Sequence, residues 1–198
     1  MPPKSSQMVP LGTTAPDFAL PDGSGTEHTL AGVQGSKGTL VIFMCNHCPF
    51  VVHIAEELAR LGQDYPEQGI GIVGISANDV VNYPDDGPDK MVETAKSWGL
   101  SFPYLYDESQ EVAKAYGAAC TPDFVVFDAN TALVYRGQLD ASRPDSGTKA
   151  DGADLRAALD ALIDGRPVPP EQVPSIGCGI KWNCLLYTSD AADEGLGV

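Results

Sequence analysis

Two cysteines separated by two residues are the most reactive feature of this sequence. Cys45-Asn46-His47-Cys48 stands between an apolar run and a helical pattern. At the start of a helix, unpaired backbone N–H groups and the positive end of the helix dipole stabilise a thiolate, the reactive form of cysteine. We therefore expect a redox pair in which an exposed Cys45 is the nucleophile. Cys48, one turn further on, would resolve the mixed disulfide and leave an intramolecular disulfide.

His47 lies inside this motif. A protonated imidazole beside a thiolate would stabilise it and make the disulfide a stronger oxidant. The alternative is an exposed histidine without a role, and the sequence leaves both interpretations open.

A second candidate element is Cys120-Thr121-Pro122, which precedes a strand pattern at Phe124. A proline at the start of a strand marks an edge or a functional turn. Thr121 and Pro122 could face the two cysteines and form a groove for an extended substrate. An ordinary trans turn is the alternative, because most X-Pro bonds are trans.

The other two cysteines of interest carry weaker signals. Cys120 is interpreted first as a small packing residue and second as an additional redox thiol. Cys178 lies in a Pro-rich, loop-like stretch, where it is either a second resolving thiol or an exposed one. Arg136, Asp140 and Arg143 are expected to form structural ion pairs at the end of a hairpin.

The elements that must position the Cys-x-x-Cys motif form a strand-helix-strand unit. The apolar run 40–44 predicts a strand buried on both faces, and 70–75 predicts a second one. Between them, apolar residues recur at helical spacing over about 49–62. Such a unit is parallel and right-handed, so the cysteines fall where a central strand ends and a helix begins.

The rest of the pattern completes an α/β domain. Hairpins are predicted over 18–30 and 124–136, and helices over 88–98 and 155–163. Asp107 and Gln110 resemble a capping box that opens one more short helix.

Composition restricts the partners and the compartment. The chain has 198 residues, 12 basic and 27 acidic side chains and a formal net charge of −15. This charge repels nucleic acid and anionic membranes, so neither is an expected partner. We expect a cytoplasmic location, since residues 1–11 have no apolar leader pattern and no apolar run approaches the roughly 20 residues of a membrane span.

The end of the chain needs separate treatment. Residues 184–194 resemble the peptide produced when a common sequencing adapter is translated, so we predict that the tail is non-native read-through and exclude it from functional reasoning. The expected organisation is a flexible N-terminus (1–11), a redoxin domain (12–166), a loop-rich extension (167–183) and the read-through tail (184–198).

Several short segments together resemble one known family. They are Gly12-Thr13-Thr14-Ala15-Pro16-Asp17-Phe18, Phe43 to Phe50 around the two cysteines, Cys120-Thr121-Pro122-Asp123-Phe124, Tyr135-Arg136-Gly137-Gln138, Ser142-Arg143-Pro144 and Gly177-Cys178 with Ile180-Lys181-Trp182. From about 12 to 182 the sequence resembles thioredoxin-fold redoxins, in the peroxiredoxin-like branch of the alkyl hydroperoxide reductase/thiol-specific antioxidant group. The resemblance implies a thioredoxin fold, in which helices flank a central mixed sheet and a β-hairpin extends the N-terminus. It also implies thiol redox chemistry and a cis bond before Pro122.

The departures from peroxiredoxins bear on the reaction. Those enzymes use a Pro-x-x-x-Thr-x-x-Cys pattern and a distant arginine to bind peroxide. Cys48 would align with the peroxidatic cysteine, but Cys45 stands at the threonine position and Val41 at the proline position. No arginine lies near Thr121. Because preorganised donors supply several kcal/mol of transition-state stabilisation, we favour thiol–disulfide exchange in redox homeostasis, and a peroxidase using Cys48 is the alternative.

Metal binding is a further alternative. Cys45, Cys48 and a histidine such as His47 or His53 could hold copper or zinc, as in copper-carrying thioredoxin-fold proteins. Structural zinc sites usually show a second pair of ligands, and the sequence offers none. We therefore expect no metal and no cofactor. The expected partners are protein or small-molecule thiols and disulfides, together with a reductant that the sequence does not identify.

Overall fold

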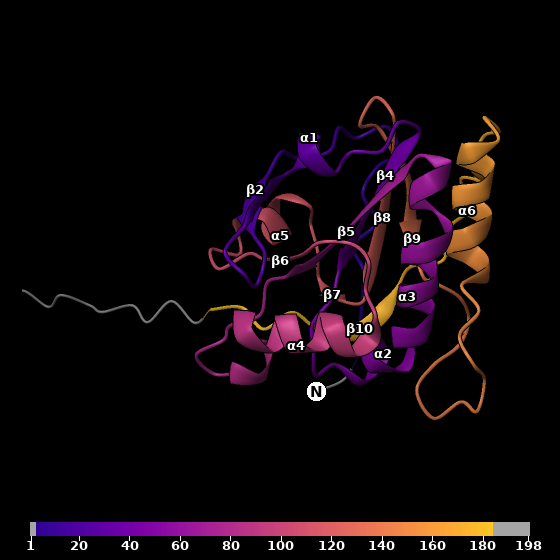
Figure 1. The fold of residues 1–198 in the computed structure, drawn as a ribbon. Helices are drawn as coiled ribbons and strands as arrows, with labels where there is room; N and C mark the ends of the chain where they lie inside the picture. The colour runs from indigo at the N-terminus through magenta and orange to yellow at the C-terminus, as the bar shows by residue number, and fades with distance from the viewer. Residues whose placement is uncertain (1–2, 184–198) are drawn as a thin grey trace, which may run out of the picture.

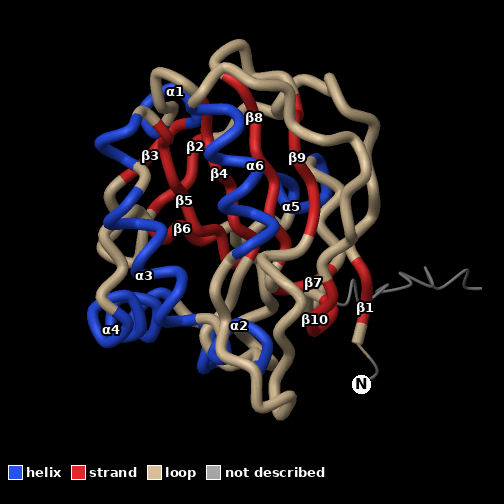
Figure 2. The backbone as a smooth tube through the Cα atoms, turned by 90° about the vertical axis from the view of Figure 1, so that its right-hand side faces the viewer, coloured by secondary structure: helices blue, strands red, loops and turns tan. Residues whose placement is uncertain are grey.

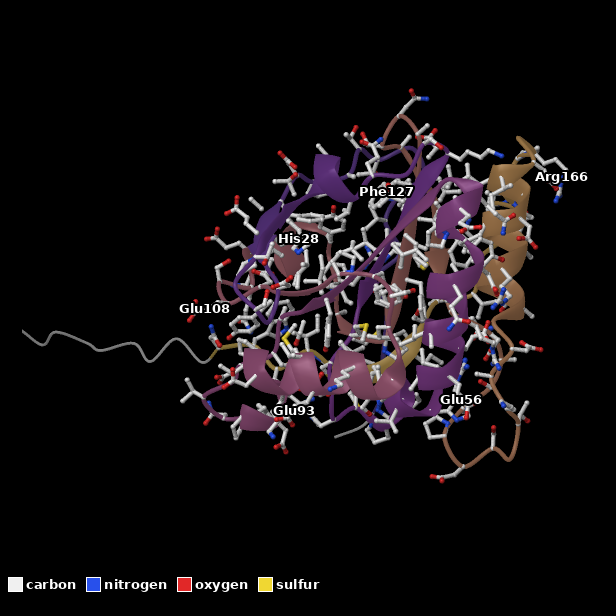
Figure 3. All side chains as sticks on the ribbon, in the orientation of Figure 1. His28, Glu56, Glu93, Glu108, Phe127 and Arg166 are labelled. Carbon is white, nitrogen blue, oxygen red and sulfur yellow. The ribbon has the colours of Figure 1, made fainter. Side chains whose placement is uncertain are left out.

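The computed structural model describes residues 3–183 of the chain (Figure 1). The predicted read-through tail lies outside the described residues. Figure 3 shows charged side chains such as Glu56, Glu93, Glu108 and Arg166 at the periphery, whereas Phe127 lies inside. No helix in the described range is long and apolar enough to cross a bilayer.

A five-stranded mixed sheet forms the centre of the domain, in the order β6-β5-β4-β8-β9. Its strands are β4 (Gly38–Phe43), β5 (Ile70–Ser76), β6 (Tyr104–Tyr106), β8 (Asp123–Asp128) and β9 (Leu133–Gly137). β5 runs parallel to β4 and to β6, whereas β8 runs antiparallel to β4 and to β9. Every residue of β4 is buried, as the apolar run predicts for a central strand.

Alternate residues of β4 face two different cores, since side chains of a strand point to opposite faces. Leu40 and Ile42 pack with residues of α2 (Pro49–His53), α3 (Ala55–Asp64), α4 (Pro88–Trp98) and α6 (Ala153–Ile163). In Figure 2, α6 lies in front of the sheet.

The opposite face of the sheet has a separate core. Val41 and Phe43 pack there against residues of the N-terminal hairpin and of two short helices. These elements are β2 (Ala19–Pro21), β3 (Glu27–Thr29), α1 (Leu30–Val33) and α5 (Glu111–Ala115). The mixed sheet, the flanking helices and the predicted hairpin are thereby confirmed.

The single helix predicted over 49–62 is wrong. α2 ends at His53 and α3 begins at Ala55, because Ile54 has φ −102° and ψ 6°, outside the helical region. The apolar spacing continues across the break because both helices pack against the same face of the sheet, so the pattern alone did not reveal it. Two short 3-10 helices, Pro66–Gln68 and Pro84–Asp86, lie in the following loops.

The capping box predicted at Asp107 and Gln110 is also wrong. Gln110 has a positive φ of 62°, and its buried side-chain amide donates to the carbonyl oxygens of Ala77 and Lys181 at 2.6 and 2.9 Å. Gln110 therefore ties the end of β5 to the C-terminal segment. Asp107 Oδ2 accepts a hydrogen bond from the Ala113 N–H at 2.8 Å, so it still satisfies one N-terminal donor of α5.

A small second sheet joins both ends of the described chain. It has the order β1-β10-β7, with β1 at Lys4–Ser5, β10 at Ile176–Gly179 and β7 at Cys120–Thr121. The loop-like stretch after residue 167 therefore contains a strand, and the N-terminal segment pairs with it. In Figure 2 the three strands lie beside each other, below the main sheet. The antiparallel register places Cys178 opposite Thr121.

Candidate redox site

Cys45 and Cys48 follow the central strand β4, as predicted. Cys48 immediately precedes the first residue of α2, and its carbonyl oxygen accepts from the N–H groups of Val51 and Val52 at 2.9 Å each. The expectation that Cys45 is exposed is wrong, since its relative exposure is 1% and that of Cys48 is 0%. The loop at 79–86 and the second sheet cover the motif, and neither could be placed from local patterns. All four cysteines of the described range are free thiols.

Thr121 faces both cysteines. Its Oγ1 lies 3.5 Å from Cys45 Sγ, and its carbonyl oxygen lies 3.1 Å from Cys48 Sγ. The bond between Thr121 and Pro122 is cis, which confirms what the family resemblance implied. The chain thus brings Thr121 and Pro122 to the redox motif across more than 70 residues.

A buried carboxylate that the sequence analysis did not single out lies on the other side of Cys45. Asp86 is fully buried, and its Oδ1 accepts from the Asn46 N–H at 2.8 Å while Oδ2 accepts from Asn78 Nδ2 at 2.8 Å. His47 Nδ1 lies 2.7 Å from Oδ2. The ring of His47 also stacks on that of Tyr83, with 5.7 Å between centroids. His47 is therefore oriented on both sides and is not an isolated surface residue.

The pKa values of the two thiols of the motif are shifted in opposite directions. A hydrogen bond with Cys48, burial and the charge of Asp86 raise the pKa of Cys45 above its usual range. Donation from Cys45 lowers the pKa of Cys48 to about 4 against the opposing effect of burial, and hydrogen bonds with Cys178 and Thr121 act in the same direction. These opposite directions favour Cys45 as the proton donor of the pair and Cys48 as its thiolate, and the hydrogen bond between the two thiols is the largest cause of both shifts. The assignment of Cys45 as the nucleophile stays a prediction.

The remaining two described cysteines differ from each other. Cys178 in β10 is half-buried, and burial together with a hydrogen bond to Cys48 raises its pKa to about 11. Cys120 is fully buried and its thiol donates to the Pro122 carbonyl oxygen at 3.7 Å. Burial and the charge of Asp123 raise the pKa of Cys120 above its usual range. These contacts agree with the interpretation of Cys120 as a packing residue.

An ion pair lies directly behind Pro122, but its members differ from those expected. Arg136 Nη2 lies 2.7 Å from Asp123 Oδ2, and both side chains are buried. Asp140 instead accepts backbone N–H groups, including that of Gly152 at 2.7 Å, and Arg143 donates to Gln138 Oε1 at 2.6 Å. The expected pairing among Arg136, Asp140 and Arg143 is therefore wrong, since Asp123 supplies the partner for Arg136.

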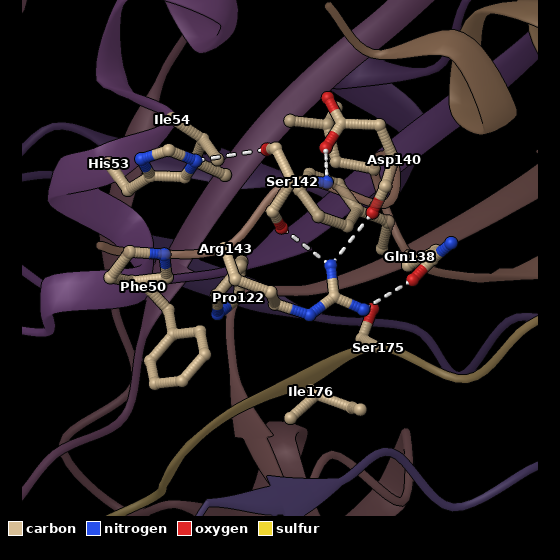
Figure 4. A pocket seen from close by; sticks show the side chains of 13 residues that line it. Phe50, His53, Ile54, Pro122, Gln138, Asp140, Ser142, Arg143, Ser175 and Ile176 are labelled. Atoms are coloured by element: carbon tan, nitrogen blue, oxygen red, sulfur yellow. Dashed lines mark hydrogen bonds between the residues drawn. The ribbon is translucent and has the colours of Figure 1, made fainter. Parts of the chain in front are cut away.

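A shallow pocket adjoins Pro122 on the outer side (Figure 4). Phe50 and His53 of α2, Pro122 and Ile176 of β10 contribute to its lining. His53 Nε2 lies 3.0 Å from Ser142 Oγ. The pocket lies beside the turn, and the binding of an extended substrate there stays a prediction.

Comparison with known proteins now identifies the family. Residues 11–136 match the AhpC/TSA family. The chain belongs to this family. It is 33% identical over 125 residues to the thiol-disulfide oxidoreductase ResA of Geobacillus thermodenitrificans, covering 62% of this chain and 66% of that protein. It is also 29% identical over 112 residues to peroxiredoxin Bcp of Escherichia coli, covering 56% and 67%. The chain thus spans just under two thirds of the length of the first of these relatives.

Solved structures extend the likeness to nearly the whole domain of this AhpC/TSA protein. An uncharacterized conserved protein from Geobacillus kaustophilus shares 54% identity at a TM-score of 0.90, over 92% of this chain and 97% of the other. The thioredoxin domain of a thiol-disulfide oxidoreductase from Bacteroides vulgatus shares 18% identity at a TM-score of 0.55, over 65% and 89%. The thioredoxin fold is confirmed.

Asp86 is the residue at the site for which the sequence held the least signal. It lies in an acidic, Pro-rich loop where neighbours such as Asp79 and Asp85 look equivalent. Only the fold shows that Asp86 turns inward, whereas Asp85 is exposed. Asp86 accepts N–H groups of Asn46 and Asn78, and its charge helps to raise the pKa of Cys45.

Replacement of Asp86 is expected to change the redox couple. In Asp86→Asn the negative charge beside Cys45 is lost, so the Cys45 thiolate forms more easily and the disulfide becomes a stronger oxidant. Equilibration with a glutathione buffer measures the reduction potential. Asp85→Asn removes an exposed charge one residue away and serves as the control. Equal potentials for the two variants would contradict the role assigned to Asp86.

Proposed function

We propose that this protein is a thiol–disulfide oxidoreductase whose redox centre is the pair Cys45 and Cys48. The observation that carries the proposal is the contact of the two thiols with each other in front of Thr121 and Pro122. One partner is a thiolate and the other holds the proton. This division is what disulfide formation and opening require, because the thiolate attacks and the protonated thiol is regenerated on release.

The surroundings of Cys48 favour disulfide exchange over peroxide reduction. Its hydrogen-bond partners in the described part of the chain are Cys45, Cys178, Thr121 and Val51, and none carries a positive charge. Arg136 is held by Asp123. Donors that would stabilise the leaving oxygen of a peroxide therefore do not surround this sulfur, although they commonly supply several kcal/mol. The name of the relative ResA supports the same choice.

The test compares two oxidants in a single turnover. Fully reduced protein is mixed with a small-molecule disulfide or with hydrogen peroxide, and thiol loss is followed in the wild type and in Cys45→Ser. We expect the wild type to exchange rapidly with the disulfide and to react slowly with peroxide. Cys45→Ser should not complete the cycle of disulfide exchange. A peroxide reaction faster than that of free cysteine, and retained in Cys45→Ser, would instead make Cys48 peroxidatic and overturn the proposal.

His47 is expected to set the potential of the couple. Its imidazole lies against Asp86, so loss of the ring leaves the carboxylate charge uncompensated beside Cys45. His47→Ala should therefore make the couple more reducing, the opposite direction to Asp86→Asn. His28→Ala is a matched control, because His28 also pairs with an aspartate, Asp22, away from the cysteines. An unchanged potential in His47→Ala would exclude the effect.

Metal binding is the second candidate, and one observation favours it. Ligand atoms of Cys45, His47 and Asp86 all lie within 4.8 Å of one another, and thiolate, imidazole and carboxylate are the usual zinc donors. The expected ligand set changes accordingly, since His53 contacts Ser142 and lies outside this group. Stoichiometric zinc or copper after purification under reducing conditions, lost in Cys45→Ser and Asp86→Asn, would support a metal site.

The partners follow from the proposed reaction. A thiol–disulfide couple needs one thiol or disulfide substrate and a second dithiol or disulfide that returns it to its starting state. Both belong to this proposal, as does a reducing, cytoplasmic compartment.

A further inference from the structure

The proposed redox pair is poorly accessible. Cys45 and Cys48 have relative exposures of 1% and 0%, whereas Cys178 is half-buried and is the only cysteine among residues 3–183 that is not fully covered. Thiol–disulfide exchange requires that an attacking sulfur reach the sulfur of the disulfide. A route between solvent and the buried pair therefore has to pass through a more accessible atom or through an opening of the site.

Cys178 is placed against the buried pair by the second sheet. The register of β10 on β7 sets Cys178 opposite Thr121, whose carbonyl oxygen lies 3.1 Å from Cys48 Sγ. The Cys178 thiol is close enough to Cys48 to help lower the pKa of Cys48. Cys48 therefore has one thiol neighbour on each side, Cys45 within its own motif and Cys178 from the distant strand.

Gly177 allows this approach. A side chain at that position would overlap the carbonyl oxygen of Thr121, so only glycine lets β10 lie this close to the turn. Pairing of Lys4 with Gly177 holds the other edge of β10. Because side chains alternate along a strand, Cys178 shares a face with Ile176, which lines the outer pocket beside Pro122.

We propose that Cys178 is the exchange thiol that connects the buried pair with an external dithiol. This inference rests on the proposed function and adds a third sulfur to its reaction. It assigns the external partner by class, as a dithiol small or flat enough to reach the half-buried sulfur of Cys178.

The reduction of the protein then takes three exchanges. The Cys178 thiolate attacks Cys48 Sγ in the oxidised protein, the Cys48–Cys178 bond forms, and the Cys45–Cys48 bond breaks with its electron pair on Cys45, which takes up a proton. A thiolate of the external dithiol attacks Cys178 Sγ, and Cys48 leaves as a thiolate. The second external thiol then displaces Cys178, so the external dithiol becomes a disulfide and the protein is fully reduced.

The kinetic test uses the full chain with Cys184→Ser as the background, so that the thiol of Cys184 cannot contribute. The oxidised protein is reduced with dithiothreitol, and samples are quenched with acid and alkylated for mass spectrometry. Cys178→Ser is expected to slow the reduction about tenfold or more, because direct attack on a buried disulfide is the remaining route. Val173→Ser, an exposed position close to β10, is the control and should keep the background rate.

A trapping experiment keeps Cys178 in place and so does not depend on how Cys178→Ser folds. In Cys45→Ser with Cys184→Ser, oxidation with diamide should give a Cys48–Cys178 disulfide in peptide maps. Absence of that disulfide, or reduction of Cys178→Ser at the background rate, would overturn the proposal. If the proposed function itself is wrong, the result differs, because the Cys184→Ser protein would then form no Cys45–Cys48 disulfide at all.

Discussion

The absorbance of the reduced protein at 240 nm is expected to show one thiolate from neutral pH down to about pH 4. An ordinary cysteine ionises near pH 8.5, so the midpoint for Cys48 should lie several pH units below that of a free thiol. The cause is the hydrogen bond that the Cys45 thiol donates to the Cys48 sulfur, assisted by Cys178 and Thr121. A pH titration of the reduced wild-type protein between pH 3 and 8 measures the midpoint.

Two variants test which thiol gives the thiolate absorbance at 240 nm. Cys48→Ser should remove the acidic transition, and Cys45→Ala should move it to higher pH, because the largest stabilising donor is lost while Cys48 stays buried. Cys178 contributes to the thiolate absorbance only at high pH, since its pKa is raised to about 11. A wild-type titration without any thiolate signal below pH 7 would contradict the assignment of the charge to Cys48.

The lowered pKa of Cys48 also makes the stability of the reduced protein depend on pH. A group whose pKa is depressed on folding stabilises the folded state above its unfolded pKa and loses that contribution as the pH falls through the folded value. The reduced protein should therefore gain stability from Cys48 at alkaline pH and lose it progressively toward about pH 4. The oxidised protein has no free Cys48 thiol, so the difference in stability between the two forms depends on pH.

The parts of the fold that the sequence predicted are those with long apolar periodicity. The runs in β4 and β5 are buried on both faces and have no polar interruption, so the strand-helix-strand unit and the position of the two cysteines could be placed from local pattern alone. Pro122 and Thr121 could be assigned to the site because the family resemblance supplied the long-range contact that periodicity does not contain.

The parts that the sequence did not predict depend on contacts between distant segments. β10 is a short strand with glycine at two of four positions, and it forms because β1 and β7 lie on either side of it. Asp86 lies among other acidic residues and is distinguished by its inward contacts with Asn46, His47 and Asn78. The same two segments cover Cys45. The exposure of Cys45 was therefore mispredicted, because Asp86 of the loop and Thr121 of the second sheet lie against the motif.

The largest effect on stability is expected from the ion pair behind Pro122. Arg136→Met should lower the free energy of unfolding by about 3–5 kcal/mol, because it leaves the buried carboxylate of Asp123 without its charge partner. Urea unfolding of the reduced protein at pH 8 measures the loss. Arg166→Met is the matched control, since its pair with Asp164 is exposed and such pairs are worth about 0–1 kcal/mol.

A double variant separates the charge of this pair from its packing. Burial raises the pKa of Asp123 to about 6 despite the nearby guanidinium, and both Asp123 Oδ1 and Arg136 Nε are buried without a hydrogen-bond partner in the described part of the chain. The pair is thus incompletely satisfied, and replacing both members removes two desolvation costs. Asp123→Leu combined with Arg136→Met should therefore recover most of the stability lost in Arg136→Met. A double variant as unstable as the single one would show that Arg136 acts through its hydrogen bonds to the carbonyl oxygens of Tyr116 and Gly117 instead.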